Sequence, residues 1–122
     1  MEELNRRYGD RVQFLAVYLR EAHPSDGWGA PDAVKQPRTT DERAAVALTC
    51  RGALDMKMPL LLDDIDDHVG HLYSGMPDRL YLIDRSGKVA YKGGRGPFGF
   101  KPAELELSMV MMLLEMGGGS QK

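Results

Sequence analysis

The sequence predicts an α/β domain with a mixed β-sheet and helices on both faces of the sheet. Three observations support this fold class. The chain has 122 residues, which suits one domain with its own core. Segments with the apolar pattern of strands alternate with segments of helical periodicity. The first strand pattern lies far from the last two, which form a hairpin, so both parallel and antiparallel pairing are expected. The domain should span residues 1–116, and the glycine-rich residues 117–122 should form a flexible tail.

The first third of the chain should contain a short helix, a strand and a long loop. Residues 2–8 have helical spacing and end before a glycine. Residues 11–19 (RVQFLAVYL) are almost continuously apolar, which is typical of a strand that is buried on both faces. Residues 20–38 contain several prolines and glycines, so we expect a loop, and ordered loops of this length are often functional.

The middle of the chain predicts a capped helix, a strand and a short helix. In residues 39–54, Thr39 and Glu42 have the spacing of a capping box. The expected apolar face of this helix consists of Val46, Cys50, Ala53 and Leu54. Residues 58–64 should form a short buried strand, and residues 65–73 a short helix.

The last third predicts a hairpin and a final helix. Strands at 79–83 and 88–92 flank the turn DRSG. The helix should begin at Pro102 and end before Gly117. It is rich in methionine and apolar nearly all round, so we expect one side to pack on the sheet. The other side should pack on a second copy of the chain, giving a homodimer, or be buried more deeply within one chain.

Composition excludes several classes of function. The net charge of −2 gives no electrostatic basis for binding nucleic acid or an anionic membrane. The sequence contains no apolar run long enough to span a bilayer and no secretory signal pattern. The single cysteine, Cys50, excludes an internal disulfide and fits a reducing compartment, so we expect a cytoplasmic protein.

Glu21 and His23 form the first candidate site, at the end of the strand at 11–19. Residues two apart at a strand end point the same way, so the carboxylate could orient the imidazole and raise its basicity. The alternative is a solvated glutamate and a histidine that caps the loop.

Other motifs allow a structural and a functional interpretation. Cys50 could be a redox thiol, although its place on an apolar helix face favours a core role. The stretch DDIDDHVGH at 63–71 could bind a metal, but an acidic start of a short helix explains it better, so we expect no metal site.

Met76–Pro77 could be a cis bond beside a substrate site or an ordinary trans turn. In GGRGPFG at 93–99, a dinucleotide loop is rejected because Pro97 interrupts it; Arg95 could grip an anion, or the segment could be a surface bend.

Three stretches together resemble the iodothyronine deiodinase family, most closely its bacterial deiodinase-like members. They are VYLREAHPSDGW at 17–28, MPLLLDD at 58–64 and DRLYLIDRSGKVAYKGGRGPFGFKPAELE at 78–106. The resemblance implies a thioredoxin-like fold, usually dimeric, and reductive chemistry that depends on a thiol or selenol. It implies a small phenolic or thiol substrate and an external thiol reductant, without a bound cofactor.

The same resemblance assigns roles to individual residues. Glu21 and His23 would be the catalytic, proton-handling pair, and Arg95 would hold the anionic or phenolic end of the substrate. Trp28 and Pro77 would also line the substrate site. Pro77 matches the position where thioredoxin-like folds place a cis-proline.

The sequence departs from the family in lacking a nucleophile before Glu21. Family members carry a cysteine or selenocysteine in a loop after a first strand, whereas this chain begins within the helix that follows that loop. Without this central strand, the flanking strands at 11–19 and 79–84 should pair directly, or a second chain should fill the gap, or the chain is a fragment. We therefore expect little or no reductive activity from the chain alone. The alternative function is a non-catalytic, dimerising binding or scaffold domain.

Overall fold

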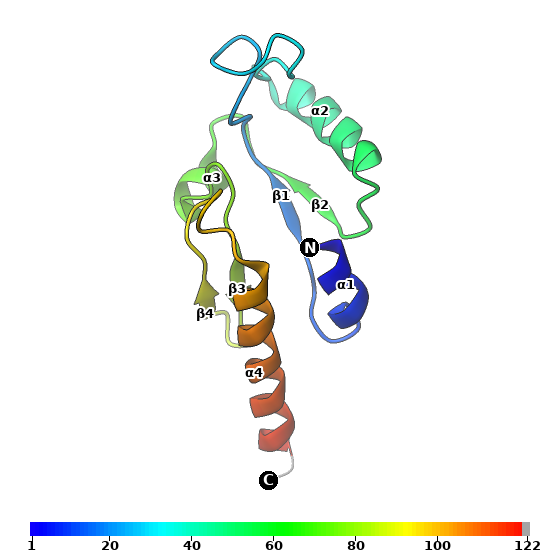
Figure 1. Ribbon diagram of the computed structural model, residues 1–122, viewed down its shortest axis with the longest axis vertical. Coiled ribbons are helices and arrows are strands. Elements are labelled where there is room, and N and C mark those ends of the chain that lie inside the picture. Colours follow the sequence, from blue (N-terminus) through cyan, green and yellow to red (C-terminus); the bar gives the residue numbers. More distant parts are fainter. Residues whose placement is uncertain (121–122) are drawn as a thin grey trace. The chain divides into compact units, whose positions relative to one another are not determined.

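The computed structural model describes residues 1–120, and the chain divides into two compact units, Met1–Met76 and Pro77–Lys122 (Figure 1). The expectation of one domain over 1–116 stays a prediction. None of the helices in the described residues is long and apolar enough to cross a bilayer.

The first unit contains three helices and a parallel pair of strands. The helices are α1 (Glu2–Tyr8), α2 (Thr40–Ala53) and α3 (His68–Tyr73). The strands are β1 (Ala16–Tyr18) and β2 (Leu60–Leu62), with Ala16 opposite Leu60 and Tyr18 opposite Leu62. Helix α2 packs on β2.

The second unit is an antiparallel hairpin with one long helix. Strands β3 (Tyr81–Ile83) and β4 (Val89–Lys92) pair in antiparallel, and α4 (Pro102–Ser120) packs on both. Leu82 of β3 is buried, as are Leu105 and Met109 of α4. These three side chains form the apolar centre of the unit.

The predicted α/β class is confirmed, and the architecture is compatible with a thioredoxin-like fold. Parallel and antiparallel pairing both occur, but in two two-stranded sheets, one in each unit. Direct pairing of the strands at 11–19 and 79–84, one of the three expected outcomes, does not occur among the described residues, and the other two outcomes stay predictions. Residues 1–10 form α1 and a turn rather than a strand.

The strands are shorter than predicted and less buried. Only three residues of the segment 11–19 form β1, and Val17 is exposed together with its register partner Leu61. Burial alternates along both strands of the pair, as on a sheet with one covered face. The prediction of a strand buried on both faces was therefore wrong.

Helix α2 begins as predicted but presents a different face to the core. Thr39 Oγ1 accepts a hydrogen bond from the N–H of Glu42 at 3.1 Å, while the Glu42 carboxylate accepts from the N–H of Arg38 at 2.7 Å. The buried residues of the helix are Arg43 and Ala47. Of the predicted apolar face, Val46 and Cys50 are half-buried, whereas Ala53 and Leu54 are exposed. The error arises because a charged residue occupies the centre of the buried face.

Arg43 is 2% exposed and holds together the segment that follows β2. Its guanidinium donates to the carbonyl oxygen of Asp64 at 2.6 Å and to Oδ1 of Asp67 at 2.8 Å. The buried carboxylate of Asp63 accepts from the N–H groups of Val69 and Gly70, at 2.9 and 2.8 Å, and so caps α3. Residues 63–67 form this bonded turn, so α3 begins at His68 rather than at 65.

The hairpin and its helix follow the sequence closely, with a longer helix than expected. In the turn, Oδ1 of Asp84 accepts hydrogen bonds from the N–H groups of Ser86 and Lys88, at 2.9 and 3.0 Å. Helix α4 continues to Ser120, past its predicted end before Gly117, because glycine lowers helix propensity without excluding helical dihedrals. Residues 121–122 of the predicted flexible tail lie outside the described residues.

Replacing Arg43 should strongly destabilise the first unit. Arg43→Ala would leave the Asp67 carboxylate and the Asp64 carbonyl without their buried partner, at a cost of about 3–5 kcal/mol in the free energy of unfolding. Arg51→Ala, on the exposed side of the same helix, should change it by less than about 0.5 kcal/mol. Urea unfolding followed by circular dichroism measures both. A cost below about 1 kcal/mol for Arg43→Ala would contradict the role assigned to this network.

Candidate functional site

The candidate site lies in the long loop between β1 and α2, at residues 19–39 (Figure 1). Tyr18, the last residue of β1, is half-buried, and its hydroxyl donates a hydrogen bond to the carboxylate of Glu21. The end of the parallel strand pair therefore positions the phenol, and the phenol positions the carboxylate.

Gln36 fixes the backbone of Glu21 from the far end of the loop. Its side-chain oxygen accepts from the N–H of Glu21 at 3.0 Å, and its Nε2 donates to the carbonyl oxygen of Glu21 at 2.9 Å. The N–H of Gln36 donates to Oδ1 of Asp26 at 2.9 Å, and this bond lowers the pKa of the Asp26 carboxyl. Gln36 thus pairs with Glu21 much as a neighbouring strand would, which closes the loop.

His23 and Trp28 form an aromatic pair within the same loop. Their ring centroids lie 4.3 Å apart in an edge-to-face arrangement. The carbonyl oxygen of Pro24 accepts from the N–H groups of Gly27 and Gly29, at 3.1 and 2.9 Å. A side chain at Gly29 would clash with the carbonyl of His23, so the tight turn requires glycine there. Trp28 is 77% exposed and presents its ring to solvent.

The structure gives Glu21 and His23 different partners. The carboxylate bonds the phenol of Tyr18, the imidazole contacts the indole of Trp28, and no hydrogen bond joins the two side chains among the described residues. Tyr18 and Gln36 were not predicted as site residues. The three-residue spacing from Tyr18 to Glu21 could have indicated their contact. No pattern in the sequence near Gln36 indicates that it binds Glu21. The proton-handling role of Glu21 and His23 stays a prediction.

Cys50 is half-buried on α2 and lies near enough to Tyr18 to influence its pKa. Burial is the largest cause of the raised pKa of the Tyr18 phenol, electrostatic interaction with Cys50 raises that pKa further, and the Arg43 guanidinium lowers it. The redox role of Cys50 stays a prediction.

Pro77 and Arg95, the other candidate residues, belong to the second unit. Met76–Pro77 is trans, because the cis bond among the described residues is Gly96–Pro97. Pro77 therefore lacks the cis geometry that the resemblance suggested.

Arg95 lies in a closed loop that hydrogen bonds fix to the start of the hairpin. The N–H of Gly96 donates to the carbonyl oxygen of Asp78 at 3.0 Å, and the N–H of Gly99 donates to that of Arg95 at 2.8 Å. A side chain at Gly99 would clash with the backbone of Gly94. The Arg95 side chain is exposed and makes no ion pair within the described residues. The segment is a hydrogen-bonded turn with an exposed cation, and the anion-binding role of Arg95 stays a prediction.

Comparison with known proteins shows the family. The profile of the iodothyronine deiodinases matches residues 1–112. The chain belongs to the iodothyronine deiodinase family. It is 43% identical over 100 residues to thyroxine 5-deiodinase of Gallus gallus, covering 79% of this chain and 38% of that protein. It is 34% identical over 108 residues to type II iodothyronine deiodinase of Petromyzon marinus, covering 85% of this chain and 37% of that protein.

The resemblance read from the motifs is therefore confirmed at the level of the family. The deiodinase-family chain spans little more than a third of the length of the curated relatives it matches. The particular likeness to bacterial members stays a prediction.

Burial raises the pKa of Tyr18, and both the hydrogen bond to Glu21 and the negative charge of Glu21 raise it further. All three effects favour the protonated phenol. Across the neutral pH range, Tyr18 is therefore a hydrogen-bond donor to an acceptor carboxylate.

Tyr18 should be the last tyrosine to ionise on alkaline titration. The raised folded-state pKa means that its contribution to stability is complete below the unfolded-state pKa of about 10 and is lost as pH rises beyond it. Absorbance at the tyrosinate band follows the ionisation of the five phenols. The last ionisation step should be lost in Tyr18→Phe and should occur at a lower pH in Glu21→Gln.

Tyr91→Phe is the matched control, since Tyr91 also donates to a carboxylate, that of Glu104, but from an exposed position. The Tyr91→Phe variant should retain the last ionisation step. If that step were also retained in Tyr18→Phe, the assignment of the highest phenol pKa to Tyr18 would be contradicted.

Proposed function

We propose that this domain supplies the proton-handling side of a reductive, thiol- or selenol-dependent deiodinase-type site. The observation that carries the proposal is the Tyr18–Glu21 hydrogen bond, which Gln36 supports in the same loop as the His23–Trp28 pair, in a chain of the deiodinase family. The substrate class is a small aromatic molecule with an iodinated phenolic ring, with a thiol as the alternative.

The chemistry requires two electrons and a proton. Reductive removal of iodine converts an aryl iodide and two thiols into the arene, a disulfide and hydrogen iodide. A thiolate or selenolate attacks the iodine, and an acid delivers a proton to the carbon that the iodine leaves. Glu21 and His23 are the proposed proton-handling residues, with Tyr18 holding the carboxylate of Glu21.

The proposed substrate contacts are exposed side chains, and each is proposed from its own surroundings. The open face of the Trp28 ring suits stacking with a phenolic ring. Arg95 carries an exposed cation that suits a phenolate or carboxylate. Pro77 remains a candidate contact from its place in the sequence.

The attacking group is the part that this chain does not supply well. Its single cysteine, Cys50, is half-buried on helix α2. We propose that the chain alone has little or no reductive activity and that an external thiol is the reductant. The single cysteine also fits the reducing cytoplasm, where we place the domain.

An assay of iodide release from thyroxine with dithiothreitol tests the proposal, together with calorimetry of thyroxine binding. Iodide release should stay at the background rate. Binding should be detectable and should weaken at least about fivefold in His23→Ala and in Arg95→Ala. The control Arg51→Ala, on the exposed side of α2, should bind normally.

Iodide release that Cys50→Ser abolishes would overturn the proposed inactivity and make Cys50 the nucleophile. Absence of binding would favour a non-catalytic binding or scaffold domain instead. The apolar outer face of α4 is the observation that favours this second function.

A further inference from the structure

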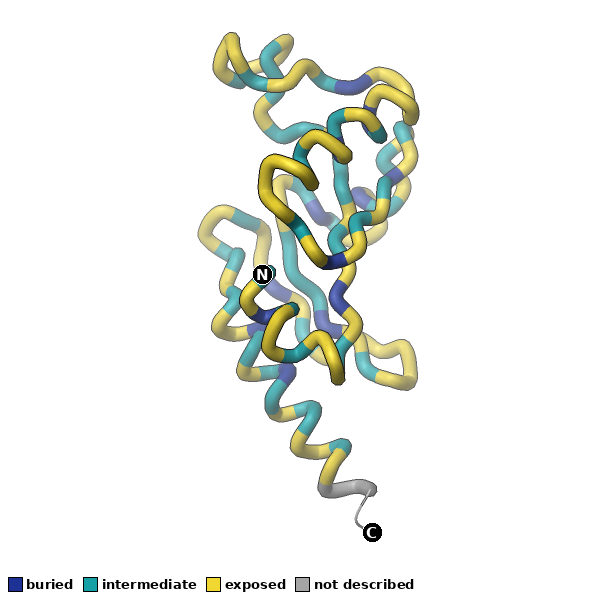
Figure 2. The backbone as a smooth tube through the Cα atoms, turned by 90° about the vertical axis from the view of Figure 1, so that its right-hand side faces the viewer, coloured by how far each residue is buried: buried dark blue, intermediate teal, exposed yellow. Residues whose placement is uncertain are grey.

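Helix α4 has a second apolar face on the side opposite its buried residues. Leu105 and Met109 are buried, and the helix packs on both strands of the hairpin. On the other side, Leu107, Met111 and Leu114 are 64%, 54% and 67% exposed. Their spacing of four and three residues places them in one stripe, here called the outer stripe, and Figure 2 shows exposed and buried positions interleaved along the helix. A helix that contacted only its own hairpin would be polar on this side.

All the charged side chains of α4 are acidic. The helix carries Glu104, Glu106 and Glu115, and its sequence contains no lysine, arginine or histidine. At about 3.6 residues per turn, Glu104 and Glu115 lie along one edge of the outer stripe and Glu106 along the other. The outer stripe is therefore an apolar band between two acidic edges.

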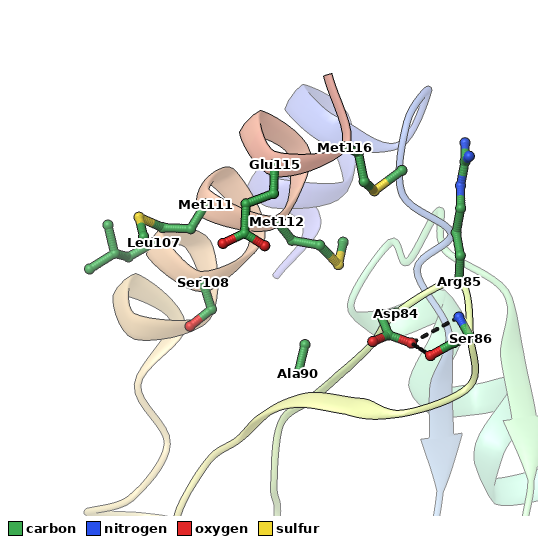
Figure 3. Close-up of a pocket in the computed structure, with 10 residues that line it drawn as sticks. All are labelled: Asp84, Arg85, Ser86, Ala90, Leu107, Ser108, Met111, Met112, Glu115 and Met116. Atoms are coloured by element: carbon green, nitrogen blue, oxygen red, sulfur yellow. Dashed lines mark hydrogen bonds between the residues drawn. The ribbon is translucent and has the colours of Figure 1, made fainter. Parts of the chain in front are cut away.

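A groove joins the edge that carries Glu115 to the turn of the hairpin (Figure 3). It has a volume of about 710 Å³. In Figure 3, the Glu115 carboxylate lies between Met111 and Met112. The turn contributes Asp84 and Arg85 to the opposite wall. The charged lining of the groove is thus acidic on balance.

The methionines of the groove suit it to apolar side chains of varied shape. Met111, Met112 and Met116 all belong to its lining. Methionine is unbranched and polarizable, so it repacks around different apolar groups and is frequent on surfaces that bind amphipathic helices. An amphipathic helix presents its apolar groups in a single stripe, which matches the outer stripe in form.

We propose that the outer stripe and groove of α4 bind an amphipathic helix of a partner protein whose apolar face is bordered by lysine or arginine. The apolar side chains of the partner cover Leu107, Met111 and Leu114, and its cations lie beside Glu104 and Glu115. The acidic edges select this partner, because opposite charges across an interface guide association and like charges reject wrong partners. A second copy of α4 would bring carboxylates against carboxylates. The homodimer expected from the sequence stays a prediction.

A fluorescein-labelled peptide of leucine and lysine, with the leucines at helical spacing, is the probe. Fluorescence anisotropy during titration with the full chain measures its binding, and we expect a micromolar dissociation constant because a contact made mainly by one helix face is small. A peptide of the same composition, shuffled so that no apolar face forms, should bind at least about tenfold more weakly. A peptide with glutamate in place of lysine should do the same. Added salt should weaken binding of the probe, since exposed charges are screened.

Substitutions on the helix test the apolar and the acidic parts of the surface separately. Leu107→Gln and Met111→Gln should each weaken binding at least about fivefold. Leu48→Gln is their matched control, because Leu48 is 67% exposed on α2 and should leave binding unchanged. Circular dichroism shows that each variant remains folded.

The charge variants act in opposite directions. Glu115→Gln should weaken binding and reduce its dependence on salt, whereas Asp66→Asn, at an exposed carboxylate before α3, should change neither. Arg85→Gln should strengthen binding, because it removes a cation from the groove wall.

Four outcomes would overturn the proposal. Equal binding of the shuffled peptide would show general attraction between charges rather than docking of a helix. Binding that Leu107→Gln and Met111→Gln leave unchanged would lie elsewhere on the chain. Absence of binding would show that the surface does not accept a basic helix. A dimer that sedimentation equilibrium detects and Met111→Gln disrupts would make a second copy the occupant. None of these measurements depends on catalysis, so the proposed function stands or fails separately.

Discussion

The buried guanidinium of Arg43 is the constraint on which the first unit depends. A charge that is withdrawn from water is tolerated only where hydrogen-bonding partners surround it. The turn after β2 provides those partners through the Asp64 carbonyl and the Asp67 carboxylate. These bonds connect α2 to the turn between β2 and α3, whereas the buried Nε of Arg43 has no hydrogen-bond partner among the described residues. Asp63 then completes the turn by capping α3.

The geometry of the candidate site depends on the strand pair β1–β2 and on helix α2. Tyr18 is the final residue of β1, which is held in register by β2. Gln36 lies three residues before the Thr39 cap of α2, so the start of that helix limits where Gln36 can reach. These two anchored residues bind the side chain and the backbone of Glu21, one from each end of the loop. A loop of this length is thus held by the elements on both sides of it.

Local signals in the sequence predicted a large part of the structure. The cap at Thr39, the hairpin with its Asp84 turn and the α/β class depend on residues within a few positions of one another. The features that escaped prediction depend on contacts over longer separations. Arg43 bonds residues more than twenty positions away, and a charged residue in a helical pattern is ordinarily assigned to the solvent face. Gln36 reaches Glu21 across fifteen positions, with no periodic pattern to mark the contact. The strands were predicted to be longer than they are. An apolar run in the sequence shows neither where strand pairing ends nor which face of the strand is covered by a helix.

The placement of Trp28 has a consequence for spectroscopy. It is the only tryptophan of the chain and lies in the loop between β1 and α2, beside the ring of His23. Intrinsic indole emission therefore reports the state of this loop, while the far-ultraviolet dichroism of the chain reports its helices. The two signals separate local opening of the candidate site from loss of the framework. The single tryptophan is thus an intrinsic fluorescent probe of the candidate-site loop.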